Sequence, residues 1–141
     1  MSELSAFLMC NAEKVKNVKF AASGRFTGKD GPILWEIRCI SSAEDEELRK
    51  VCTKRVPSPR GKGTYTNETD INLYLGKLAA MATVFPDLTS SDLQDSYGVM
   101  GDDALLKAML TPGEYAEYLA KVQEVCGFDR AFPELVDEAK N

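Results

Sequence analysis

The chain has 141 residues, a net charge of −5 and no histidine. This length suffices to bury one hydrophobic core, and 44% hydrophobic with 28% charged residues is an ordinary composition for a globular domain. The lack of histidine excludes a Ser-His-Asp or Cys-His catalytic group within the chain, and we expect neither a signal peptide nor a membrane span.

A short helix is predicted at residues 3–10, where Leu4, Phe7 and Leu8 fall on one side. At residues 14–22 the pattern changes to an alternation of apolar and polar side chains. That alternation indicates a strand. It is interrupted once, at Asn17 and Val18, and a β-bulge there would account for the interruption.

A turn and a second strand complete the predicted β-hairpin. Asp30-Gly31-Pro32 is typical of a turn, because glycine accepts a positive φ and proline ends the pairing. Residues 33–40 then alternate, with Trp35 and Ile37 facing the core.

A helix is predicted to begin at Ser41, because Ser41 and Glu44 form a capping box. Its apolar stripe consists of Leu48, Val51, Cys52 and, at the edge, Val56. Pro57 ends it, and the segment 57–66, rich in Pro and Gly, is predicted to be a flexible loop.

The most apolar stretch of the chain predicts a core helix over about residues 68–85, capped by Thr66 or Asn67. Apolar residues recur at helical spacing on one face: Ile71, Tyr74, Leu75, Leu78, Ala82 and Phe85. Much of the remaining circumference is apolar too, so we expect this helix to be buried on several sides.

Three shorter helices are predicted in the rest of the chain. One covers residues 90–96, with Thr89 and Asp92 resembling a capping box. Another covers residues 102–110, and a last one lies around residues 133–139.

The clearest helix start is at Thr111, where Thr111 caps, Pro112 takes the first position and Glu114 closes a capping box. The apolar stripe of this helix consists of Tyr115, Tyr118, Leu119, Val122, Val125 and Cys126. Gly127 is typical of the end of a helix.

These elements predict an α+β fold, mostly α-helical, in which a small N-terminal antiparallel β-hairpin packs with a helical C-terminal half. The chain reads as a single domain over residues 1–141. Within it, a basic part covers 1–56, the flexible loop 57–66, and an acidic helical part 67–141.

Charge is distributed unevenly: residues 1–62 carry a net charge of +4 and residues 63–141 a net charge of −9. Such asymmetry is found in nucleic-acid-binding arms, but it equally lets the two halves attract each other, within one chain or between neighbouring copies. We favour attraction between the halves, because the acidic half would repel phosphate.

No pattern of residues indicates a catalytic, metal or cofactor site. The four cysteines (Cys10, Cys39, Cys52 and Cys126) form no CxxC pair, so free thiols are expected. The lysine after Gly28 precedes a strand rather than a helix, which disfavours a phosphate-binding loop. Helix capping accounts for the paired aspartates, Asp92 with Asp95 and Asp102 with Asp103.

The order of several short motifs resembles the XkdN-like phage tail assembly chaperones over nearly the whole chain. The most specific motifs are Arg25-Phe26, Trp35-Glu36-Ile37-Arg38, Phe85-Pro86-Asp87-Leu88 with Leu93-Gln94 and Tyr97-Gly98, and Met109-Leu110-Thr111-Pro112-Gly113-Glu114-Tyr115.

The resemblance implies a non-catalytic protein of the bacterial host cytoplasm, made by a contractile-tailed phage or prophage. Its implied role is to keep the tape-measure protein soluble and to assist assembly of the tail-tube protein around it. It implies no cofactor and no catalytic residue.

For the partner-binding surface we predict an apolar groove in the helical half, with Tyr97, Val99 and Met100 near its edge. The basic loop residues Arg60 and Lys62 are predicted to hold an acidic partner. Two alternatives stay open: a small phage-derived nucleic-acid-binding or regulatory protein, and a structural tail component retained in the virion.

Overall fold

The computed structural model describes residues 3–128, as a mixture of helices and small antiparallel sheets that confirms the predicted α+β class. The helices are η1 (Glu3–Phe7, a 3-10 helix), α1 (Ser42–Val51), α2 (Ile71–Ala82), α3 (Ser91–Tyr97), α4 (Asp102–Met109) and α5 (Pro112–Val125). The strands are β1 (Val18–Phe20), β2 (Thr27–Gly28), β3 (Gly31–Pro32), β4 (Trp35–Ile37), β5 (Thr53–Pro57), β6 (Tyr65–Thr69) and β7 (Thr83–Phe85). The helix predicted around residues 133–139 lies outside the described residues.

The central sheet has the order β1-β4-β7 and is antiparallel throughout. Val18 pairs with Ile37 and Phe20 with Trp35, which confirms the predicted pairing of two N-terminal strands. Trp35 and Ile37 are buried, as predicted. The register shifts between β4 and β7 rather than in β1, so the predicted position of the bulge is wrong.

The turn before β4 is a hairpin of its own, formed by β2 and β3. Gly31 has a φ of 112°, the positive value that the sequence predicts there. Pro32 nevertheless pairs with Thr27, so the prediction that Pro32 ends the pairing is wrong. Proline lacks only the N–H, and an edge strand tolerates that loss.

Helix α1 begins as predicted but ends early. The Ser41 hydroxyl accepts from the Glu44 amide and the Glu44 carboxylate accepts from the Ser41 amide, which confirms the capping box. The helix stops at Val51, and the chain continues as strand β5 instead of reaching Val56. Val51 is therefore exposed rather than part of the apolar stripe, whereas Cys52 is fully buried.

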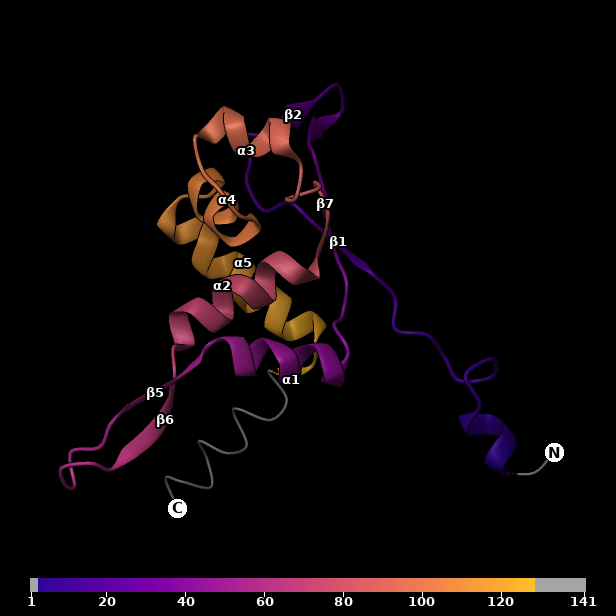
Figure 1. Ribbon diagram of the computed structural model, residues 1–141. Coiled ribbons are helices and arrows are strands. Elements are labelled where there is room, and N and C mark those ends of the chain that lie inside the picture. Colours follow the sequence, from indigo (N-terminus) through magenta and orange to yellow (C-terminus); the bar gives the residue numbers. More distant parts are fainter. Residues whose placement is uncertain (1–2, 129–141) are drawn as a thin grey trace, which may run out of the picture.

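The segment predicted as a flexible loop is largely the end of a β-hairpin. Strands β5 and β6 pair from Thr53 with Thr69 to Pro57 with Tyr65, and residues 58–64 join them. The Thr53 and Thr69 hydroxyls bond at 2.8 Å, and the Arg55 guanidinium lies 4.5 Å from the centre of the Tyr65 ring. The hairpin projects from the body at the lower left of Figure 1.

The predicted core helix is shorter at both ends than expected. Asp70, not Thr66 or Asn67, caps α2 by accepting from the Leu73 amide. Helix α2 ends at Ala82, and the next residues form β7, so Phe85 lies on the sheet edge and is 51% exposed. The middle of the helix is buried on several sides, as predicted.

Three helices complete the body. Ser90, rather than Thr89, caps α3 by accepting from the Leu93 amide, so the predicted capping box is wrong there. Gly101 precedes α4 without any side-chain cap, which corrects the capping role predicted for Asp102 and Asp103. Helix α5 has the predicted capping box between Thr111 and Glu114, with Pro112 in its first turn.

Helix α2 is the centre of the packing, in contact with α1, α4 and α5 (Figure 1). Gly76 lets α5 approach closely, because a Cβ at this position would lie 2.9 Å from the Tyr115 hydroxyl oxygen. On the sheet side, the Trp35 and Tyr118 rings meet edge to face at 5.3 Å.

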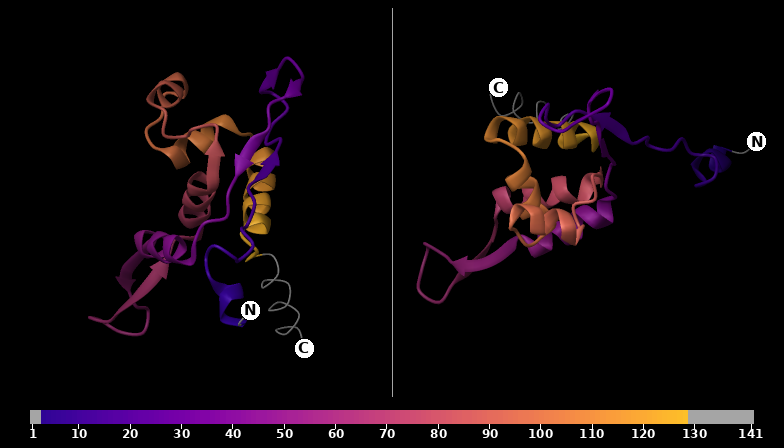
Figure 2. Two further views of the ribbon diagram at one scale, coloured as in Figure 1. Left: turned by 90° about the vertical axis from the view of Figure 1, so that its right-hand side faces the viewer. Right: turned by 90° about the horizontal axis from the view of Figure 1, so that it is seen from above.

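Two extensions leave this body on opposite sides, as Figure 2 shows from above. One is the β5–β6 hairpin and the other is the N-terminal arm, which we define as residues 3–17. The predicted N-terminal helix is present only as the short 3-10 helix η1, and its apolar residues Leu4 and Phe7 are 71% and 81% exposed. Among the described residues, no helix has the length and apolar character needed to cross a membrane.

Candidate partner-binding surface

Several of the ionisable side chains form hydrogen bonds that stabilise the fold. Within residues 3–128 no group of three or more Cys, Asp or Glu side chains is arranged to hold a metal ion. Burial raises the pKa of the Cys52 thiol, which makes it a poorer nucleophile.

The Glu114 carboxylate ties the β2–β3 region to the start of α5. It accepts from the Ser23 hydroxyl at 2.6 Å, from the Thr111 amide and from the Arg25 guanidinium at 3.3 Å. The Arg25 guanidinium also donates to the Met109 carbonyl. These bonds, with Ser23 first, lower the pKa of Glu114 to about 2.

A similar carboxylate joins the sheet to α1. The Arg38 guanidinium donates two hydrogen bonds to Glu44, at 3.0 and 2.8 Å. Together with the Ser41 amide they lower the pKa of Glu44 to about 2. Both carboxylates close capping boxes and also bind a residue outside their own helix, which is Arg38 for Glu44 and Ser23 for Glu114.

An apolar pocket opens between the β2–β3 hairpin, β7 and α3. Its volume is about 140 Å³ and every lining side chain is apolar: Phe26, Ile33, Trp35, Phe85, Pro86, Leu93 and Met109. Trp35 is its buried floor, whereas Ile33 and Phe85 at its rim are 41% and 51% exposed. We call this site the sheet-edge pocket.

Sequence reasoning missed the sheet-edge pocket because its walls come from four separate elements. Phe85 was assigned to a helix face, and only its position in the sheet turns it toward Phe26 and Ile33. The motifs that carry the family resemblance supplied the one available signal, since several lining residues belong to them.

Three of the predicted partner-binding residues meet at the corner between α3 and α4. Tyr97 and Val99 are half-buried and pack against the core, while Met100 is 93% exposed. The corner is fixed by Gln94, whose side-chain amide donates to the Leu88 carbonyl and accepts from the Gly101 amide. We call it the α3–α4 corner.

The other two predicted residues lie far from that corner. Arg60 and Lys62 are exposed in the loop that joins β5 and β6, at the opposite end of the body from α3 (Figure 1). The structure thus divides the predicted residues between two surfaces, an apolar one and a basic one.

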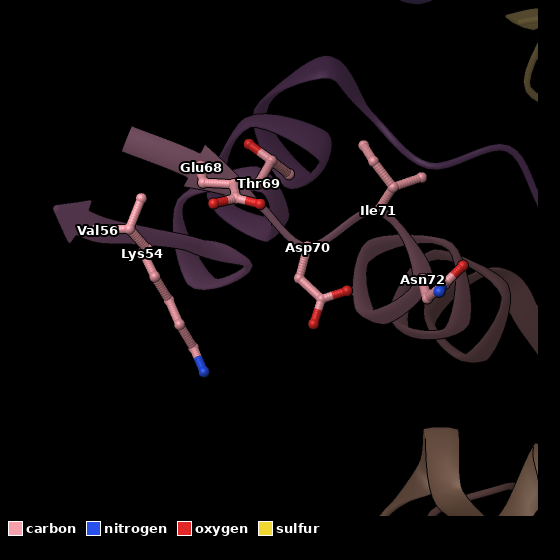
Figure 3. A pocket seen from close by; sticks show the side chains of 7 residues that line it. All are labelled: Lys54, Val56, Glu68, Thr69, Asp70, Ile71 and Asn72. Carbon is pink, nitrogen blue, oxygen red and sulfur yellow. The ribbon is translucent and has the colours of Figure 1, made fainter. Parts of the chain in front are cut away.

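A hollow of about 380 Å³ lies at the base of the β5–β6 hairpin, where β6 turns into α2 (Figure 3). Lys54 and Asp70 extend along the same side of it. The Asp70 carboxylate accepts from the Leu73 amide, and its own amide donates to the Cys52 carbonyl. The hollow is lined by both polar and apolar side chains, and one of its two acidic groups, that of Asp70, serves as a helix cap.

Comparison with known proteins matches nearly the whole chain to one protein family. Residues 4–140 match the model of the family described as phage XkdN-like tail assembly chaperone protein. The protein XkdN of the phage-like element PBSX in Bacillus subtilis (strain 168) is 29% identical over 99% of this chain and 94% of its own length.

A second relative from B. subtilis, YqbN, is 28% identical over 99% of this chain and 93% of its own length. The crystal structure of YqbN superposes with a TM-score of 0.76, covering 90% of this chain and 98% of that chain at 24% identity. At this level of identity, the structural match supports the fold alone.

Proposed function

The chain belongs to the XkdN-like family of phage tail assembly chaperones, and from this membership we propose that it binds the tape-measure protein and assists assembly of the tail tube. The observation that carries the proposal is the family match over residues 4–140. The proposed action is non-catalytic and takes place in the cytoplasm of the bacterial host.

The surfaces of the body support a role in binding a helical partner. An amphipathic helix docks by placing apolar residues into a groove with a polar rim. The α3–α4 corner offers Met100, an exposed and adaptable apolar side chain, beside the half-buried Tyr97 and Val99. We propose that this corner contacts the apolar face of the tape-measure protein.

The basic β5–β6 loop is the proposed second contact. Arg60 and Lys62 are exposed, and neither forms an ion pair within residues 3–128. They are therefore available to acidic side chains of a partner, in contacts that mainly steer association and weaken with salt.

A capture experiment tests the proposed surface. The chain is immobilised and exposed to the tape-measure protein of the same phage, as wild type, Met100→Asp and Val51→Asp. Val51 is also exposed, at 64%, but lies on α1. We expect Met100→Asp to capture about tenfold less than wild type, because a charge replaces an apolar side chain that the bound partner would bury. We expect Val51→Asp to capture as much as wild type. Equal capture by all three chains would refute the assignment of this corner.

The nucleic-acid alternative has less support. The aromatic ring nearest to the basic loop is Tyr65, and the Arg55 guanidinium covers one face of it. A base would have to displace that contact in order to stack. Filter binding over a salt series tests this alternative, because binding to phosphates must weaken steeply as salt rises.

A further inference from the structure

The N-terminal arm carries a cluster of exposed large hydrophobic residues. Leu4, Phe7, Leu8 and Met9 are 50–87% exposed, and none of them packs against the hydrophobic core. The backbone hydrogen bonds of the arm are local, from Leu8 to Ser5 and from Asn11 and Ala12 to Leu8. A cluster of large apolar side chains held away from the body indicates an interaction site.

The sheet-edge pocket has the size and chemistry to receive one of these side chains. It is wholly apolar and measures about 140 Å³. An apolar cavity of about 150 Å³ is known to bind benzene, so a phenyl ring is a suitable occupant. Phe7 is the one aromatic residue of the arm and is 81% exposed.

The register of the central sheet directs the arm of each copy away from its own pocket. Phe20 pairs with Trp35, the floor of the pocket, whereas Val18 pairs with Ile37 further along β4. The chain preceding Val18 therefore leaves the sheet at the end remote from the pocket. Figures 1 and 2 show the arm continuing outward from that end.

The lysines of the connecting segment complement two carboxylates that neighbour the lining residues in sequence, whereas the Arg25 guanidinium over the lining residue Phe26 is already paired with Glu114. Lys14 and Lys16 are exposed between η1 and β1, and neither is in an ion pair among the residues that the structure describes. Asp87 and Asp92 are exposed and adjoin the lining residues Pro86 and Leu93. An arm lying across this rim would bring opposite charges together.

From these four observations we propose that the N-terminal arm of one copy docks onto a second copy, with Phe7 inserted into the sheet-edge pocket. Because an arm meets a pocket rather than its own equivalent, the contact generates either a reciprocal exchange of two arms about a two-fold axis or, where it is not reciprocated, a chain of copies. This proposal does not depend on binding of the tape-measure protein.

Sedimentation velocity over a concentration series tests the proposal, in reducing buffer because the exposed Cys10 would otherwise cross-link copies. We expect the wild-type chain to self-associate and Phe7→Ser to weaken association by about tenfold or more, because a buried phenyl group is lost. Val15→Ser is the matched control: Val15 is 70% exposed but lies outside η1. A wild-type chain that stays monomeric would overturn the proposal.

A mixing experiment distinguishes docking between copies from docking within one. Ile33→Ser damages the rim of the pocket and leaves the arm intact, whereas Phe7→Ser damages the arm and leaves the pocket intact. Docking between copies predicts that an equimolar mixture associates more strongly than either variant alone, because the mixture restores one intact arm–pocket pair. A mixture that behaves as the average of its components would contradict the proposal.

Discussion

At the scale of single residues, two tyrosines of α5 have opposite environments. The Tyr118 hydroxyl pairs with the Thr83 hydroxyl at 2.6 Å, and burial raises the pKa of Tyr118 to about 12. The Tyr115 hydroxyl is also buried but has no hydrogen-bond partner among the described residues. A buried polar group without a partner destabilises the folded state, whereas a paired one stabilises it.

Substituting each tyrosine by phenylalanine should therefore change the free energy of unfolding in opposite directions. We expect Tyr118→Phe to lower the free energy of unfolding by about 1 kcal/mol, and Tyr115→Phe to raise it by about 1 kcal/mol. Urea denaturation of both variants measures the difference. A loss of stability in Tyr115→Phe equal to that in Tyr118→Phe would show that the Tyr115 hydroxyl is satisfied.

The two clamping carboxylates make stability depend on pH. Glu44 and Glu114 have pKa values of about 2 in the folded chain, against an ordinary value of 4.5. Because the folded-state values are depressed, their stabilisation is present above pH 4.5 and is lost as pH falls from 4.5 towards 2. The substitution Glu44→Gln preserves the capping geometry but removes the titrating group. We expect the stability of this variant to decline less steeply than that of the wild type between pH 4.5 and pH 2. Thermal unfolding at several pH values measures the two slopes. An unchanged slope would contradict the role of the Arg38–Glu44 pair.

At the scale of elements, the helix starts marked by a complete capping box could be predicted from the sequence, whereas the ends of α1 and α2 could not. The capping boxes at Ser41 and Thr111 are local and were correctly predicted. The ends of α1 and α2 depend on partners distant in sequence. Thr53–Pro57 pairs with a strand beyond the loop of residues 58–64, which is longer than the usual two to five residues and lacks the two-residue turn that marks a hairpin in sequence. Thr83–Phe85 becomes a strand because β4 offers an edge.

The cap of α3 gives a direct test of one corrected element. The Ser90 hydroxyl accepts from the Leu93 amide, whereas the Thr89 hydroxyl donates to Asp87 at 2.6 Å. We expect Ser90→Ala to cost about 1 kcal/mol of unfolding free energy and Thr89→Ala less than about 0.5 kcal/mol. Denaturation midpoints compare the two, and a larger loss in Thr89→Ala would restore the cap that the sequence suggested.

At the scale of the whole molecule, the fold class and the family could be predicted from the sequence. Composition and the order of motifs can be read without knowing which residues are in contact. The candidate surfaces were not predictable in the same way. The sheet-edge pocket collects residues from four elements, and the predicted residues lie in separate loops, with Met100 between α3 and α4 and Lys62 between β5 and β6. The sequence shows a basic half and an acidic half, but it does not show that two segments, the N-terminal arm and the β5–β6 hairpin, extend from the body.

The measurement that tests the central claim most directly is the solubility of the tape-measure protein when it is produced with and without this chain in the same cells. We predict that the tape-measure protein is found largely in the soluble fraction, and co-purifies with the chain, only when both are produced. A tape-measure protein whose soluble fraction is the same in both cases would contradict the proposed chaperone function.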